Sequence, residues 1–369
     1  MVAEPNSWVR GAGRRTAQGN PSSWADVPTR AGDMGWDALA WGEVLAAGRR
    51  ARLLPLWHDA LQRAGRLSTL PPDVRQALQS AHYAALVANT LALEAATKVS
   101  TQLAAAGVDV VTLKGVALLA TVYPSPGARP LGDIDLWVRA GDAARAEAVL
   151  RQADYADLPH QRARGPQRFL AERAFIRRTP PRLQVDLHTA PFARPALHHA
   201  VLAEWFWSHT LTISTAYGPL CVFDPAAQFV HLCLHATQHD EGRLAPLRLY
   251  DLTLVMSDQG IDWRAVLDIA QATHITPAIM QAVAATADVW GASPPAGLAW
   301  PRASWGDRLR CALLASEHRL IRWLIDGWAL RDSVCMAALW WALLWPAPAY
   351  RAWRATIDAR EGGSCKVWR

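Results

Sequence analysis

The sequence contains few cysteines and no secretory signal. Its 369 residues include five cysteines, which are widely spaced and form no CxxC pair. This pattern argues against a disulfide framework and against a thiolate zinc site. Residues 1–15 are polar and basic and lack the apolar segment of a signal peptide. We therefore expect a cytoplasmic protein.

Lysine is also scarce, since only three of the 38 basic residues are lysine: Lys98, Lys114 and Lys366. The net charge of +6 nevertheless favours anionic partners such as nucleotides, nucleic acid or a membrane surface. This excess is modest for a protein dedicated to nucleic acid, which is therefore the less favoured partner. A hydrophobic content of 51% and a charged content of 19% are typical of a globular protein.

The pattern of apolar and turn residues divides the chain into four parts. Residues 1–32 are rich in Pro, Gly, Ser and Arg and predict a disordered tail, and residues 33–107 predict a helical N-terminal module. Residues 108–224 mix strands and helices and form the expected core, and residues 225–369 predict a helical C-terminal domain. Strands are expected at 108–113, 133–138, 172–179, 182–188, 211–215 and 220–223. Helices are expected at 36–65 (with a break near Pro55), 73–106, 142–153, 225–239, 246–258, 262–273, 277–290, 304–329 and 332–345.

The stretch from Val108 to Val138 carries the first candidate site residues. An apolar strand ends in Lys114 and Gly115, and a Pro/Gly loop further on carries Arg129. A glycine where a strand meets a helix lets backbone N–H groups approach a phosphate closely. Lysine and arginine side chains would neutralise a triphosphate. The stretch therefore predicts a site that handles phosphate.

Three acidic residues on strands complete this prediction. Asp133 and Asp135 alternate along one strand, so their side chains point the same way, about 7 Å apart. In the strand 182–188, Asp186 and His188 share the polar face, and Pro180-Pro181 joins that strand to its neighbour. Carboxylate oxygens suit Mg²⁺, which also binds substrate phosphates. A lone DxD pattern is common on exposed strands, but here the order of strand, Lys-Gly, arginine loop, DxD and later strand Asp favours a catalytic site.

The order LKG…R…DIDLWV…VDLH resembles the nucleotidyltransferase superfamily with the DNA polymerase beta-like core. It looks more narrowly like the bacterial group of uncharacterised nucleotidyltransferases, over residues 36–263, which also include the helix pair HLCLHATQH…RLYDL. The resemblance implies an α+β fold, with a small mixed sheet forming the nucleotidyltransferase core between helical N-terminal and C-terminal regions. It also implies a glycine motif at Gly115 and catalytic metal ligands at Asp133, Asp135 and Asp186.

The glycine motif departs from the pattern of that superfamily. Gly115 has no neighbouring serine and lies eighteen residues before Asp133 rather than about ten. We expect Lys114 or Arg129 to make the phosphate contact that the serine makes elsewhere. Lys114, Gly115, Arg129 and His188 are therefore the predicted nucleotide-binding residues, although His188 would alternatively hydrogen-bond Asp186.

These observations predict a Mg²⁺-dependent nucleotidyltransferase with two metal ions. We expect it to move a nucleoside monophosphate, AMP in the first instance, from an NTP such as ATP to an acceptor. The acceptor would be a hydroxyl or other group on a small molecule, peptide or protein, in natural-product or surface-polysaccharide tailoring. Two alternatives stay open: an ATP-dependent kinase, and a non-catalytic helical adaptor that binds a protein partner or a membrane surface.

Three further features have plainer explanations beside the functional ones. A helix carries His231, His235 and His239 four residues apart, as a metal site or as part of a buried helix. Seven arginines within residues 161–182 form either an anion-binding rim or a solvated surface: Arg162, Arg164, Arg168, Arg173, Arg177, Arg178 and Arg182. The apolar run 334–345 is too short to span a bilayer. With its tryptophans it suits peripheral membrane contact, a partner-binding face or a buried helix.

Overall fold

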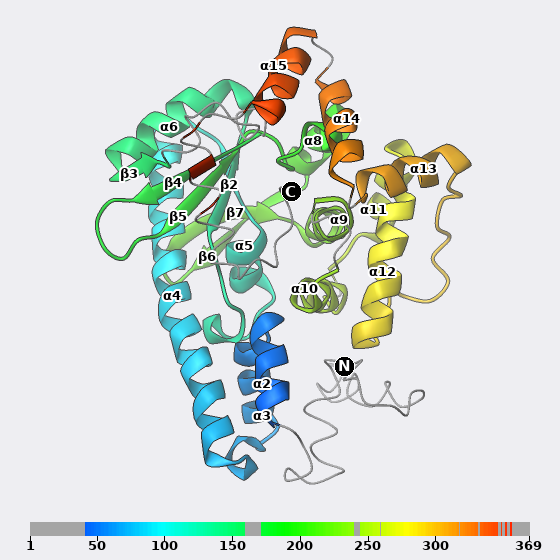
Figure 1. Ribbon diagram of the computed structural model, residues 1–369. Coiled ribbons are helices and arrows are strands. Elements are labelled where there is room, and N and C mark those ends of the chain that lie inside the picture. Colours follow the sequence, from blue (N-terminus) through cyan, green and yellow to red (C-terminus); the bar gives the residue numbers. More distant parts are fainter. Residues whose placement is uncertain are drawn as a thin grey trace.

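The computed structural model (Figure 1) describes residues 41–158, 171–239, 244–258, 260–316, 318–330 and 333–345, together with residues 348, 351, 352 and 355. The predicted tail, residues 1–32, lies outside the described residues. So do three of the seven arginines in the basic segment: Arg162, Arg164 and Arg168.

The described chain begins with a helical hairpin and a long helix. Helices α2 (Trp41–Arg50) and α3 (Leu54–Arg63) precede a short 3₁₀ turn, η2 (Leu67–Thr69), and α4 (Pro72–Ala105). The predicted break near Pro55 falls slightly earlier, because proline is tolerated in the first turn of a helix and Pro55 lies in the first turn of α3. Helix α4 ends at Ala105, one residue before the predicted end, and Gly107 follows with a φ of 70°, which glycine adopts without a Cβ clash.

A seven-stranded mixed sheet forms the middle of the described chain. Its strands are β1 (Val110–Leu113), β2 (Ile134–Val138), β3 (Tyr155–Asp157), β4 (Glu172–Arg177), β5 (Gln184–His188), β6 (Thr210–Thr215) and β7 (Gly218–Phe223). The strand order is β3-β4-β5-β2-β1-β7-β6. Strand β2 runs parallel to β5 and β1 parallel to β7, while the other neighbours are antiparallel. The predicted α+β fold is confirmed, and β3 is the strand that the sequence pattern did not predict.

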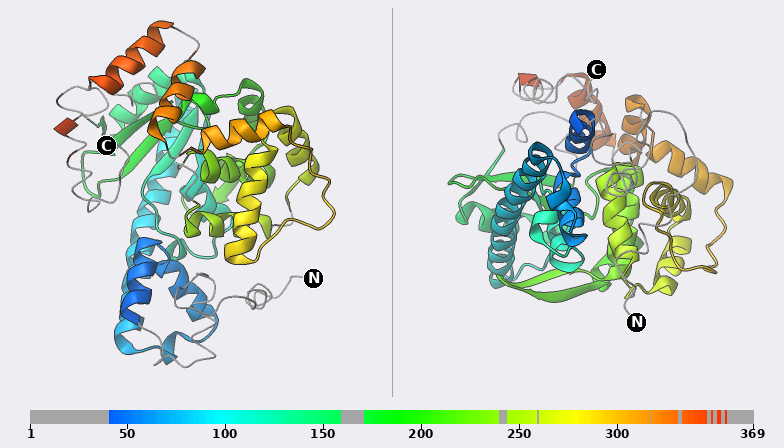
Figure 2. Two further views of the ribbon diagram at one scale, coloured as in Figure 1. Left: turned by 45° about the vertical axis from the view of Figure 1, so that its right-hand side comes forward. Right: turned by 90° about the horizontal axis from the view of Figure 1, so that it is seen from below.

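Helices cover the sheet from two sides. The long helix α4 packs against β1 and β7, and α6 (Ala143–Gln152) packs against α4 and β3. Helix α5 (Lys114–Thr121) packs against β1 and β2, and α8 (Ala200–Ser208) precedes β6. Figures 1 and 2 show α9 to α13 beside the sheet, on the side away from α4. Short 3₁₀ turns connect these elements: η3 (Pro126–Ala128), η4 (Ala140–Asp142) and η6 (Pro195–Leu197).

The C-terminal part is helical, as predicted. It contains α9 (Pro225–Leu234), the π-helical turn η7 (His235–His239), α10 (Pro246–Met256), α11 (Trp263–Ala272), α12 (Thr276–Trp290), α13 (Trp305–Leu314), α14 (Arg319–Ala329) and α15 (Ser333–Leu344). The prediction of one helix over 304–329 was wrong, since α13 and α14 are separate. Ser316 Oγ accepts a hydrogen bond from the backbone N–H of His318 at 3.1 Å, and such side-chain bonds compete with the helical ladder.

Helix α15 coincides with the apolar run 334–345. The side chains of Trp341, Leu344 and Trp345 are exposed at 53%, 70% and 70%. In the described part of the chain, no helix combines the length and apolar character needed to cross a membrane. Peripheral membrane contact through this helix stays a prediction.

Candidate functional site

The sheet places two of the predicted carboxylates directly beside each other. Asp135 on β2 is the register partner of Asp186 on the parallel strand β5. Their side chains therefore share one face of the sheet, and both are buried, at 3% and 6% exposed. Asp133 immediately precedes β2, two residues before Asp135, so the strand starts one residue later than the predicted DxD strand. The order of strands thus assembles the three acidic residues that the sequence singled out.

Lys114 and His188 both bond Asp135. Lys114 Nζ lies 2.6 Å from Asp135 Oδ1, and His188 Nε2 donates to the same oxygen at 2.8 Å. The predicted hydrogen bond from His188 to Asp186 is absent, and Gln184 Nε2 donates to Asp186 Oδ1 instead, at 2.8 Å. Lys114 starts α5 with a φ of 50°, a conformation that costs free energy outside glycine. The strained backbone holds the ammonium group among the carboxylates.

A fourth carboxylate, Glu172, joins the cluster and was missed from the sequence. Glu172 on β4 pairs with His188 on β5, and its Oε2 lies 3.8 Å from His188 Nδ1. The signal was present in the predicted hairpin, because Glu172 and His188 lie equally far from Pro180 along the chain. A hairpin centred on that turn pairs them, which places Glu172 on the same face as Asp186. We call Asp133, Asp135, Glu172 and Asp186 the carboxylate cluster.

The charges of the carboxylate cluster are only partly balanced. Burial alone would raise the pKa of Asp135, but the Lys114 ammonium and the His188 hydrogen bond hold that pKa well below its usual range. Burial and the neighbouring carboxylates, Glu172 first, raise the pKa of Asp186 to about 8. Burial and Asp135 likewise raise the pKa of Asp133. Burial opposes the charge on Lys114, yet Asp135 and Glu172 raise the pKa of its amine. The cluster therefore has room for more positive charge than Lys114 supplies.

The donor set of the cluster fits a hard divalent cation. Four carboxylates supply only oxygen ligands, which Mg²⁺ prefers. Burial first, and then neighbouring carboxylates, raise the pKa values of Asp133 and Asp186. In the described residues, however, no three His, Cys, Asp or Glu side chains are already arranged to hold a metal ion. One oxygen of Asp135 is bonded by Lys114 and His188. A bound cation would therefore require small adjustments of these side chains.

Arg129 does not point freely towards a phosphate. Its Nε and Nη2 donate to the two carboxylate oxygens of Asp251, each at 2.8 Å, and Tyr123 Oη donates to Asp251 Oδ1 at 2.7 Å. Asp251 is 1% exposed. Burial opposes the charge on Arg129, but Asp251 raises the pKa of its guanidinium group. Arg129 thus forms a buried, two-bond ion pair with α10, and its phosphate contact stays a prediction.

Gly115 serves packing in the structure. A Cβ at this position would lie 2.2 Å from Leu131 Cδ2 and 2.7 Å from Arg129 Nη1. The residue is buried in the first turn of α5. Glycine is therefore required here by the close approach of the Arg129 loop, and its predicted phosphate contact is not needed to explain it.

The histidine and arginine segments have structural partners. His231 is 1% exposed and its Nε2 donates to the carbonyl of Pro191 at 3.1 Å. Burial, with the nearby Lys114 charge, lowers the pKa of His231 to about 3, so the ring is neutral. This supports the alternative in which His231 belongs to a buried helix. The chain becomes π-helical at His235, so the predicted regular spacing to His239 is lost. In the basic segment, Arg173 forms an ion pair with Glu147 on α6.

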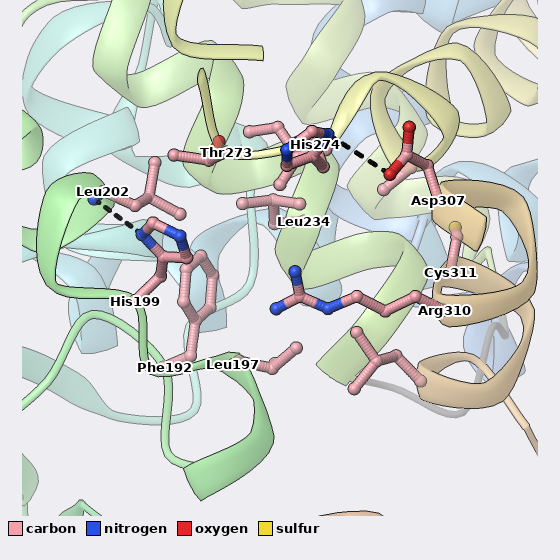
Figure 3. Close-up of a pocket in the computed structure, with 13 residues that line it drawn as sticks. Phe192, Leu197, His199, Leu202, Leu234, Thr273, His274, Asp307, Arg310 and Cys311 are labelled. Carbon is pink, nitrogen blue, oxygen red and sulfur yellow. Dashed lines mark hydrogen bonds and ion pairs between the residues drawn. The ribbon is translucent and has the colours of Figure 1, made fainter. Parts of the chain in front are cut away.

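Figure 3 shows a small pocket that Phe192, His274 and Arg310 help to line. Phe192 stacks on the His231 ring at a centroid distance of 5.0 Å and lines this pocket with Arg310 and His274. His274 Nδ1 lies 3.2 Å from Asp307 Oδ1, an ion pair drawn in Figure 3. The cavity holds about 20 Å³, space for about one water molecule. This pocket is therefore too small for a nucleotide.

The chain is similar to a known protein family and to a solved structure. A family model described as "Uncharacterised nucleotidyltransferase" matches residues 37–291, more than two thirds of the chain. Among solved structures, the chain is similar to an antigenic nucleotidyltransferase-like protein from Paracoccidioides brasiliensis. That similarity has 14% sequence identity and a TM-score of 0.33, and it covers 51% of this chain and 92% of the other. No curated protein matches the chain.

The Arg129–Asp251 ion pair yields a stability prediction. Asp251→Asn leaves the Arg129 guanidinium buried without its counter-charge, so we expect a loss of about 3–5 kcal/mol in the free energy of unfolding, measured by urea denaturation. The double variant Arg129→Met/Asp251→Leu should lose less, because no charge remains buried. Asp268→Asn, which breaks an exposed pair with Arg264, is the control and should change stability little. A loss for Asp251→Asn as small as for the control would contradict the structural role.

Gly115 gives a second prediction. Gly115→Ala should lower the free energy of unfolding by about 1–3 kcal/mol, because the new methyl group meets Leu131 and Arg129. Gly132→Ala is the matched control, since a Cβ there has no neighbour within 4 Å. Thermal unfolding and ATP titration would be measured together. A Gly115→Ala protein of unchanged stability and impaired ATP binding would favour the original phosphate contact.

Proposed function

The chain belongs to the family of uncharacterised nucleotidyltransferases, and from this membership we propose that it transfers a nucleoside monophosphate from an NTP to an acceptor. ATP is the proposed donor, and AMP is the group transferred. The acceptor is proposed to be a hydroxyl group on a small molecule, peptide or protein, in natural-product or surface-polysaccharide tailoring.

The observation that carries this proposal is the carboxylate cluster on one face of the sheet. Asp135 and Asp186 lie on adjacent strands, and Asp133 immediately precedes the strand of Asp135. Their carboxylate oxygens are hard ligands of the kind that Mg²⁺ prefers, and Mg²⁺ also binds substrate phosphates. Lys114 adds one positive charge in contact with Asp135. Strand pairing places Asp135 and Asp186 side by side without a ligand, and their side chains would adjust when a cation binds.

Asp133, Asp135 and Asp186 would hold the metal, with two Mg²⁺ ions expected. When bound, Mg²⁺ supplies positive charge that screens the triphosphate and the departing pyrophosphate. Glu172, 23% exposed, lies at the margin of these three residues and would add negative charge. Lys114 and His188 orient Asp135 through their bonds to its Oδ1. The role of these two residues is thus to position a ligand.

The proposed reaction is a substitution at the α-phosphorus. The acceptor oxygen forms a bond to the α-phosphorus while the bond from that phosphorus to the bridging oxygen breaks, and pyrophosphate leaves. The proton of the acceptor hydroxyl passes to a carboxylate oxygen of Asp186. Asp186 accepts this proton in its ionised form, which a bound cation would favour.

The position of the transferred label tests this function. With α-labelled ATP, the acceptor pool (cell extract fractions) should become labelled, and with γ-labelled ATP it should not. Asp133→Asn and Asp186→Asn should each reduce the transfer by about a hundredfold or more, in line with loss of a group that acts in the transition state. Asp268→Asn, exposed on α11, is the matched carboxylate control. Transfer from the γ position alone would show a kinase, and activity that survives both cluster variants would favour the adaptor.

Metal binding should depend on pH in a direction set by Asp186. Below its pKa of about 8 the Asp186 carboxyl group holds a proton, which a bound cation must displace. The affinity for Mg²⁺, measured by calorimetry, should therefore fall as the pH is lowered from 8.5 to 6.5, by up to about tenfold per pH unit. In Asp186→Asn this slope should become shallower. An affinity that is equal at both pH values in the native sequence would contradict the prediction.

A further inference from the structure

Two arginines lie next to the Arg129–Asp251 ion pair. Arg52, in the turn between α2 and α3, donates from Nη2 to the carbonyl of Pro130 at 3.3 Å, so its guanidinium group lies against the residue that follows Arg129. Arg248 precedes Asp251 by one turn of α10, on the same face of that helix. Its Nη1 donates to His235 Nδ1 at 3.0 Å. We call Arg52 and Arg248 the arginine pair.

The arginine pair adds positive charge beside the Arg129–Asp251 ion pair. Arg129 and Asp251 neutralise each other through two hydrogen bonds. Asp251 and Asp133 both act to raise the pKa of Arg52 and of Arg248. Burial is the largest influence on Arg248 and lowers its pKa to about 10. Two guanidinium groups thus lie within electrostatic range of Asp133.

The backbone at Arg52 supports a role beyond packing. Its φ of 61° is left-handed, a conformation that glycine or asparagine adopts at lower cost. Lys114, with a φ of 50°, is similarly strained, and it too interacts with Asp133. Strained residues of this kind cluster at ligand-binding sites, where the side chain has a reason to be kept. Arg52 and Lys114, two positively charged residues near Asp133, thus both have backbone conformations that cost free energy.

There is also space beside Arg52. With Arg49, Pro130 and Leu131 it lines an open pocket of about 360 Å³ between α3, α4 and the segment that leads to Asp133. Arg52 is exposed, and among the described residues it has no ion-pair partner. Its guanidinium group can therefore reach a ligand without first breaking an ion pair.

We propose that Arg52 and Arg248 bind the β- and γ-phosphates of the nucleoside triphosphate, on the Asp133 side of the carboxylate cluster. This inference rests on the proposed function and gives the phosphate contacts to residues other than those predicted. Lys114 is engaged by Asp135 and Arg129 by Asp251, whereas the arginine pair flanks the approach to Asp133. A guanidinium group matches two phosphate oxygens at once, which suits the terminal phosphates of an NTP.

Ligand titrations test the arginine pair. ATP, AMP and inorganic triphosphate would each be titrated in the presence of Mg²⁺ into the native sequence, Arg52→Gln, Arg52→Lys and Arg248→Gln. Each glutamine variant should weaken binding of ATP and inorganic triphosphate about tenfold or more, because a charged hydrogen bond is lost, and should leave AMP binding unchanged. Arg52→Lys should weaken ATP binding less, since lysine keeps the positive charge but cannot form the two parallel hydrogen bonds of a guanidinium group. Arg264→Gln, an exposed arginine on α11, is the matched control.

The outcomes separate this inference from the proposed function. Equal weakening of ATP and AMP would point to a general structural effect and overturn the inference, as would wild-type affinities in both glutamine variants. Absence of inorganic triphosphate binding to the native sequence would overturn it as well. If Arg248→Gln unfolds, the Arg52 variants decide the matter, because Arg52 is exposed. If the glutamine variants lose ATP and triphosphate binding but label is transferred only from the γ position of ATP, the role of the arginine pair is supported and the proposed nucleotidyl transfer is contradicted.

Discussion

The repulsion among four carboxylates, of which Asp135 and Asp186 are buried, is the constraint on which the candidate site depends. Burial together with close negative neighbours raises the pKa of Asp133 and Asp186, and Lys114 offsets this repulsion at Asp135 alone. Such a cluster lowers the stability of the folded chain when all its groups are charged, so it is hard to explain by packing. The strand order β4-β5-β2-β1 forces the carboxylates together, and a divalent cation with a nucleotide would relieve the repulsion.

A second buried contact links this site to the helical C-terminal part. Asp251 on α10 holds Arg129 with two hydrogen bonds, across 122 residues of sequence, and so fixes the loop that leads to Asp133. Arg52 from the N-terminal helices donates to the carbonyl of Pro130 in the same loop, and Arg248 on α10 interacts electrostatically with Arg129 and Asp133. The loop before β2 is thus where the three parts of the chain meet. This arrangement explains why residues far apart in sequence converge on one side of the carboxylate cluster.

Much of the fold, and part of the site, followed from local patterns. Alternation along two strands was enough to place Asp135 and Asp186 on polar faces, and the Pro180-Pro181 turn predicted the β4–β5 hairpin, from which Glu172 could also have been found. The roles of Arg129 and Gly115 could not be predicted, because both depend on contacts with residues distant in sequence. Local periodicity contains no information about Asp251 or Leu131 as their neighbours. The split between α13 and α14 was missed because a single serine side chain competes with the helical ladder.

The central claim is that the carboxylate cluster is the metal and nucleotide site. The most direct measurement is an anomalous difference map from crystals grown with Mn²⁺ and a non-hydrolysable ATP analogue. The account predicts a Mn²⁺ peak about 2.0–2.2 Å from carboxylate oxygens of Asp133 and Asp186, with the α-phosphate beside it. A fully occupied analogue whose metal and phosphates lie away from these residues would contradict it.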